Sequence, residues 1–81
     1  MPGRLRGERP TALTPRQRQI VALVADGWPN KEIAAELGIA VRTVEHTMTD
    51  IMTRMRVTNR TELAMLAVRH PEALDGERSD P

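Results

Sequence analysis

The chain has 81 residues, 28% of them charged, and its basic residues exceed its acidic residues by a single charge. This length supports one domain with a small hydrophobic core, and the absence of Cys excludes disulfides and thiolate zinc sites. No apolar run approaches the roughly 20 residues that span a membrane, and no apolar signal sequence begins the chain, so we expect a cytoplasmic protein. Strand-forming residues never alternate over a useful length, which predicts an all-α fold.

The charges are distributed unevenly along the chain. Residues 1–19 hold five Arg and one Glu, and residues 41–60 hold four Arg against two acids, whereas residues 20–40 and 61–81 are acidic on balance. A basic excess on an N-terminal arm and on a long helix is compatible with a surface that faces phosphate. Arg-rich arms are also often only solvated, so this pattern by itself identifies no partner.

The first helix has a clear start. Residues 1–12, rich in Gly, Pro and Arg, are predicted to form a flexible basic arm that either solubilises the chain or touches DNA. Thr14, Pro15 and Gln17 then supply a capping hydroxyl, a proline suited to the first helical position and a glutamine that reaches back to the cap. We expect a helix over residues 14–26, followed by Trp28, the only aromatic residue, covering the edge of the core.

A helix-turn-helix is predicted from residues 30–37 and 41–55. Each segment carries one apolar stripe at helical spacing, and a glycine lies between them. Ala34, Gly38 and Val44 have the spacing of this motif, because the small alanine lets the helices approach, the glycine allows the bend and the valine fills the crossing point. The combination is typical of a unit that reads DNA.

A fourth helix is predicted over residues 60–69, opened by Asn59 and Glu62 in a capping-box pattern. This helix is apolar on two sides, and so small a chain leaves one side without a partner, which indicates self-association. We assign the dimer face to Leu63, Leu66 and Ala67. Residues 71–81 are predicted to form a flexible acidic tail.

The longer helix of the unit is expected to bury its apolar residues and to turn a polar face centred on His46 outward. Residues near the start of such a helix face base edges in the major groove, so we predict base contacts from Glu45, His46 and Thr49. Phosphate contacts are predicted at helix N-termini and from basic residues: Asn30, Lys31, Arg42, Arg54 and Arg60. Polar residues on outer helix faces are often only solvated, and it is the projecting shape of the motif that favours double-stranded DNA as the partner.

Enzyme function is not expected. His46 and His70 have no nucleophile or second metal ligand beside them in the sequence, no glycine-rich phosphate loop is present, and the domain is too small for a cleft. We therefore predict no catalytic residue, no metal and no cofactor.

The chain resembles the LuxR/NarL-type (GerE-like) DNA-binding domain of bacterial transcription regulators over residues 13–69. The resemblance rests on the segments LTPRQRQIV, GWPNKEIAAELGIAVRTVE and VTNRTELA. It implies a four-helix domain whose third helix enters the major groove and whose fourth helix forms a homodimer. It implies base contacts at Glu45, His46 and Thr49, and phosphate contacts at Lys31 and Thr43.

The chain departs from the family pattern at several positions. Gln17 and Gln19 stand where the family usually has Glu, so neutral hydrogen bonds are expected in place of an internal ion pair. Ala40 stands where Ser or Thr often caps the third helix, and losing that cap should cost about 1 kcal/mol. Glu45 and Thr47 stand where Lys and His are frequent, and an acid among the base-reading residues weakens the attraction to phosphate.

The expected organisation is a flexible basic arm over residues 1–12, a LuxR-type domain over 13–70 and a flexible acidic tail over 71–81. Because Met1 lies only a dozen residues before the first helix, we expect a stand-alone single-domain regulator or an excised domain, with no receiver or ligand-binding domain. Such a protein acts on the nucleoid and is controlled by its abundance or by a partner, such as RNA polymerase or another regulator.

Two other interpretations remain open. Region 4 of a bacterial sigma factor has a similar TPRQR-like start and a similar helix-turn-helix core, but the fourth helix after VTNRTELA disfavours it. A protein-interaction module that binds and modulates another regulator is favoured by the low net charge and by Glu45.

Overall fold

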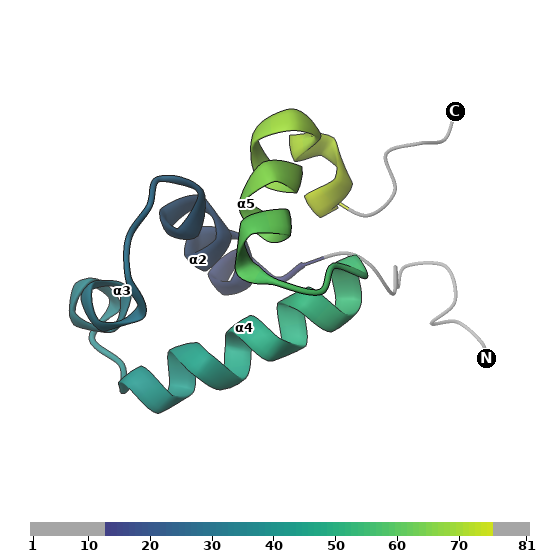
Figure 1. The fold of residues 1–81 in the computed structure, drawn as a ribbon. Coiled ribbons are helices and arrows are strands. Elements are labelled where there is room, and N and C mark those ends of the chain that lie inside the picture. The colour runs from purple at the N-terminus through teal and green to yellow at the C-terminus, as the bar shows by residue number, and fades with distance from the viewer. Residues whose placement is uncertain (1–12, 76–81) are drawn as a thin grey trace.

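The computed structural model describes residues 13–75, drawn in colour in Figure 1. This part of the chain contains helices and no strand, so the all-α prediction is confirmed. The helices are α2 (Pro15–Ala25), α3 (Asn30–Leu37), α4 (Val41–Met55), α5 (Arg60–Arg69) and the short 3-10 helix η1 (Pro71–Asp75). The α-helices begin and end within about one residue of their predicted bounds, which is the usual uncertainty of helix ends. The predicted arm over residues 1–12 and the last part of the predicted tail lie outside the described residues.

The start of α2 is fixed by the predicted capping box. The backbone N–H of Gln17 donates to Thr14 Oγ1 at 3.1 Å, and the backbone N–H of Thr14 donates to Gln17 Oε1 at 2.9 Å. Pro15 occupies the first turn, where its missing N–H costs nothing. These reciprocal bonds satisfy two backbone donors that a helix start otherwise leaves without partners.

The turn between α3 and α4 has the predicted conformation. Gly38 ends α3 with φ +67°, in the left-handed region that a residue without Cβ adopts at little cost. The backbone N–H of Ile39 donates to Ala34 O at 3.0 Å, which satisfies a carbonyl at the end of α3. Ile39 is half-buried and packs against the core, so the turn holds the two helices at a defined angle.

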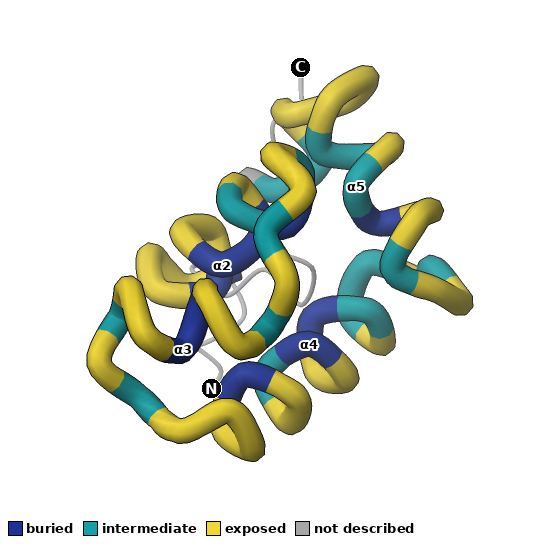
Figure 2. The backbone as a smooth tube through the Cα atoms, turned by 60° about the vertical axis from the view of Figure 1, so that its left-hand side comes forward, coloured by how far each residue is buried: buried dark blue, intermediate teal, exposed yellow. Residues whose placement is uncertain are grey.

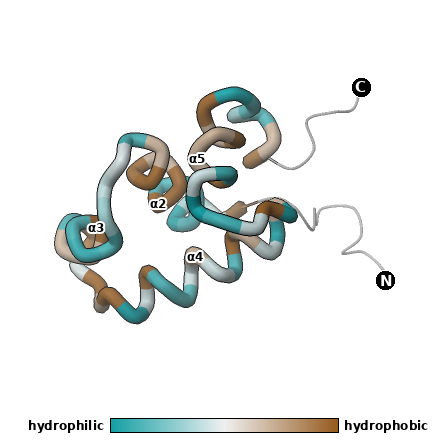
Figure 3. The backbone as a smooth tube through the Cα atoms, viewed as in Figure 1, coloured by the Kyte–Doolittle hydropathy of each residue, from teal (hydrophilic) through white to brown (hydrophobic). Residues whose placement is uncertain are grey.

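Every α-helix contributes at least one fully buried side chain to the core, and α2 and α4 contribute two each: Ile20, Val21, Ile33, Val44, Ile51 and Leu63. Figure 2 shows buried segments, in dark blue, on α2, α3, α4 and α5. Trp28 packs against this cluster from its edge, as predicted. In Figure 3 the apolar segments of α2 lie between the other helices, and α4 alternates apolar and polar residues along its length. The most extensive contacts between elements join α2 with α5, α3 with α4 and α5 with η1, and α2 also contacts α4.

Two sequence-based assignments are wrong. Leu63, predicted on the dimer face, is completely buried because α5 turns that residue toward α2 and the core. Residues 71–75, predicted in a flexible tail, form η1 instead, and Leu74 packs against the core. The backbone N–H of Leu13 donates to Leu74 O at 3.3 Å, so η1 closes over the start of the domain.

Candidate nucleic-acid interface

The helix α4 separates a buried side from an exposed side. Val44 and Ile51 are fully buried, and Met48 is nearly so. The residues on the opposite side are exposed: Arg42, Thr43, Glu45, His46, Thr49, Asp50 and Thr53. Figure 1 shows α4 running along one edge of the molecule, where this exposed side is unobstructed by the other described helices. The predicted base-reading residues Glu45, His46 and Thr49 therefore lie together on one accessible surface.

Small side chains shape this surface into an open depression. It is lined by His46, Thr47, Thr49, Asp50 and Thr53. The hydroxyl of Thr49 donates to Glu45 O at 3.2 Å, and the hydroxyl of Thr53 donates to Thr49 O at 2.9 Å. Because these hydroxyl protons bond within the helix, the threonines offer methyl groups and oxygen lone pairs to a ligand.

Both helices of the helix-turn-helix begin without a side-chain cap. Pro29 precedes α3 and Ala40 precedes α4, and neither side chain accepts a hydrogen bond from its helix. The prediction that α4 lacks a side-chain cap, made because Ala40 stands at the cap position, is therefore confirmed. The N–H groups of Glu32 and Thr43 donate to Pro29 O and Ala40 O, so the first two N–H groups of each helix are the ones left for an outside acceptor, and the helix dipole makes this end attractive to anions. The exposed Lys31, Arg42 and Thr43 lie in these first turns.

The remaining residues predicted to contact phosphate have different surroundings. Arg54 lies half-buried in the last turn of α4. Arg60 Nη1 donates to Asn30 Oδ1 at 2.7 Å, and Arg60 Nη2 donates to Trp28 O. Two residues that sequence analysis assigned separately to phosphate therefore bind each other. No sequence pattern indicated this pair, because 30 residues separate its members.

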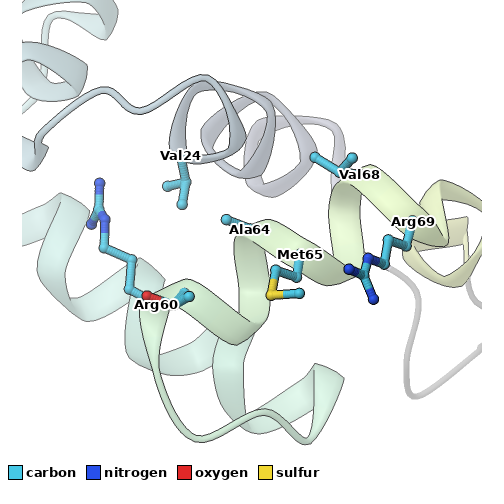
Figure 4. A pocket seen from close by; sticks show the side chains of 7 residues that line it. Val24, Arg60, Ala64, Met65, Val68 and Arg69 are labelled. Carbon is cyan, nitrogen blue, oxygen red and sulfur yellow. The ribbon is translucent and has the colours of Figure 1, made fainter.

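The helix α5 presents an apolar surface that differs from the predicted one. Met65 and Val68 are 43% and 67% exposed and lie beside a depression lined by Val24, Arg60, Thr61, Ala64, Met65, Val68 and Arg69, shown in Figure 4. Of the predicted dimer residues, Leu66 is half-buried and Ala67 packs against the core. The exposed apolar side of α5 is thus the one that carries Met65 and Val68.

Within residues 13–75 no group of three or more His, Asp or Glu side chains is placed to hold a metal ion. No described helix is both long and apolar enough to cross a membrane.

Comparison with known proteins identifies the family. Residues 11–67 match the bacterial regulatory proteins of the luxR family. The chain is 41% identical over 59 residues to the transcriptional regulatory protein LiaR of Bacillus subtilis (strain 168), a match that covers 73% of this chain and 28% of LiaR. It is 39% identical over 62 residues to the transcriptional regulatory protein FixJ of Azorhizobium caulinodans, covering 76% of this chain and 29% of FixJ.

A third relative is the response regulator Rre1 of Synechocystis sp. (strain ATCC 27184 / PCC 6803 / Kazusa), 42% identical over 57 residues, which are 70% of this chain and 25% of Rre1. The matched region is therefore less than a third of the length of each of these relatives. Since the family match extends over most of the chain and over all four α-helices except the end of α5, this protein belongs to the luxR family of bacterial regulatory proteins and carries its DNA-binding helix-turn-helix domain.

Proposed function

We propose that this protein recognises a specific duplex DNA sequence by placing α4 in the major groove, as the DNA-binding part of a transcription regulator. The observation that carries this proposal is the exposed polar side of α4 opposite a fully buried apolar side. The buried side fixes the helix on the domain, and an α-helix fits the width of the B-DNA major groove. The relatives named transcriptional regulatory proteins support the same function.

Three exposed residues are proposed to read bases. His46 donates to guanine acceptors, Thr49 presents its methyl group to thymine, and Glu45 accepts from the amino group of cytosine. All three lie in the first three turns of α4, which is the part of a recognition helix that faces base edges. Asp50 lines the same depression and disfavours close approach of phosphate at that point.

Phosphate contacts are proposed at the two uncapped helix starts, where Asn30, Lys31, Arg42 and Thr43 lie, with Arg54 further along α4. Backbone N–H groups and positive side chains at these ends bind phosphate without reading sequence, so they set the orientation of α4 in the groove.

A homodimer is proposed through α5. Its exposed apolar residues Met65 and Val68, with the half-buried Leu66 beside them, form a surface that a second copy would cover. A two-fold dimer places two recognition helices on successive major-groove faces of a palindromic site. The protein would act in the cytoplasm on the nucleoid, alone or within a longer protein, together with RNA polymerase or another regulator.

The experiment that tests this function is selection of bound fragments from genomic DNA by the purified protein at several salt concentrations. We expect a motif with two-fold symmetry, and an affinity that falls with salt at a slope near −0.9 per phosphate contact. The absence of any enriched fragment, with negligible binding at low salt, would contradict DNA recognition and favour a protein-interaction module.

A further inference from the structure

We propose that Arg60 is a positioning residue for DNA binding: it holds the start of α3 so that Lys31 meets a phosphate, and it does not itself contact DNA. This inference rests on the proposed DNA-binding function. It replaces the sequence-based assignment of Arg60 to phosphate, because the structure gives both ends of its guanidinium to acceptors inside the protein.

The connection between α2 and α3 is held differently at its two ends. At the α2 end, the backbone N–H of Gly27 donates to Val24 O at 2.9 Å and that of Trp28 donates to Leu23 O at 3.0 Å. At the α3 end, Pro29 has no side chain that can cap the helix. Arg60 supplies the missing attachment, because its guanidinium binds the carbonyl of Trp28 and the side chain of Asn30, on either side of Pro29.

The packing of the helices makes this attachment consequential. The helix α3 packs chiefly against α4, whereas α5 packs chiefly against α2, so the Arg60 bonds link the start of α5 with the start of α3 in addition to the contacts that α4 makes with α2 and α5. Those bonds join residues 30 and 32 positions apart in the sequence. Figure 4 shows the Arg60 side chain reaching away from Met65, toward the α3 side of the molecule. Loss of the guanidinium would free the start of α3 without removing a core side chain.

The chemistry of the contact requires arginine. Both acceptors are neutral oxygens, and the planar fork directs two donors to two separate acceptors. A lysine ammonium retains the charge but lacks the fork. The Arg60→Lys variant therefore separates an effect of geometry from an effect of charge.

The test measures affinity for the selected duplex, and thermal unfolding, for Arg60→Lys, Arg60→Met, Lys31→Ala and the two double variants with Lys31→Ala. If Arg60 positions Lys31, both Arg60 variants weaken DNA binding by about tenfold, and each changes affinity by less than about twofold once Lys31 is already Ala. The exposed Arg16 of α2 provides the matched control, since Arg16→Met removes one positive charge and should leave affinity within about twofold.

Other outcomes would overturn the proposal. Arg60 would meet phosphate directly if two results were found together. The fold losses of DNA affinity would multiply in the double variants, and Arg60→Lys would bind DNA about as tightly as the wild type. A lower melting temperature with unchanged affinity at a temperature where the variants are folded would mean a purely structural role. Failure of the wild-type protein to bind any duplex would instead refute the proposed function. The Arg60–Asn30 contact could still be measured in that case from the free energies of unfolding of Arg60→Met, Asn30→Ala and their double variant.

Discussion

Gln17 at the start of α2 and Asp50 in the middle of α4 are joined by a hydrogen bond from Nε2 to Oδ2 at 3.4 Å. The same glutamine accepts from the Thr14 backbone through its other side-chain atom, so its amide group satisfies the helix start and the contact with α4 together. Gln17 is the one buried polar residue among the described residues. A neutral amide is suited to this position, because a carboxylate there would face Asp50.

We therefore expect Gln17→Glu to lower the free energy of unfolding by about 1 kcal/mol at neutral pH, because two carboxylates then lie close together. Combining it with Asp50→Arg should recover the loss, since the pair becomes attractive. Chemical denaturation of the single and double variants measures both effects. A Gln17→Glu protein as stable as wild type would show that the bond to Asp50 contributes little.

The residues proposed to read bases and those proposed to bind phosphate should respond differently to substitution. His46→Ala or Thr49→Ala should reduce the preference for the selected sequence over random duplex by about 1 to 3 kcal/mol. Lys31→Ala should weaken binding to both duplexes alike and lower the salt slope by about 1. Titrations with both duplexes at several salt concentrations distinguish these responses. Equal losses on specific and random DNA for all three variants would contradict the assigned roles.

Substitutions on the two apolar sides of α5 should also differ in their effects, one on dimerisation and the other on stability. Val68→Glu is expected to weaken dimerisation while leaving the helical signal intact, because Val68 is 67% exposed. Leu63→Ala, a change on the buried side, should lower the free energy of unfolding by about 2 to 5 kcal/mol. Sedimentation equilibrium and circular dichroism measure these two outcomes. A Val68→Glu protein that remains dimeric would place the interface elsewhere.

Acid should weaken the start of α5 through Glu62. Hydrogen bonds from the backbone N–H of Thr58 and then from its hydroxyl, at 2.7 and 3.0 Å, hold the pKa of Glu62 below its ordinary value of 4.5. A carboxyl whose pKa is lower in the folded state stabilises the protein above its unfolded pKa, and this contribution is lost as the pH falls through the folded pKa.

Melting temperatures of the wild type and of Glu62→Gln should therefore differ at pH 7 and converge as the pH falls below 4.5. Thr58→Val offers a matched test, since it removes only the hydroxyl donor and should lessen the difference without abolishing it. Melting curves that remain parallel over this pH range would contradict the role of the carboxylate.

Local patterns predicted the secondary structure well. The Thr14 cap, the glycine at the end of α3 and the Asn59 cap each involve residues a few positions apart, so their chemistry is readable from the sequence. The side chain of Asn59 accepts from the backbone N–H of Glu62 at 2.9 Å, as predicted, but the Glu62 side chain accepts from Thr58, so only this half of the predicted capping box forms. The polar face of α4 was predictable for the same reason, because helical periodicity places its members together.

The sequence alone thus determined the all-α class, the four α-helices, the helix-turn-helix and the surface of α4 on which the proposed base-reading residues lie. Only the tertiary structure decided which side of α5 is buried, because Leu63 and Val68 both lie on apolar sides and the choice depends on packing against α2. It also decided the partners of Arg60, since a long side chain can reach several places and only the packed helices bring Asn30 within 2.7 Å. Periodicity reports which residues share a face of one helix, whereas the rotation of that helix against its neighbours is set by contacts between residues far apart in the chain.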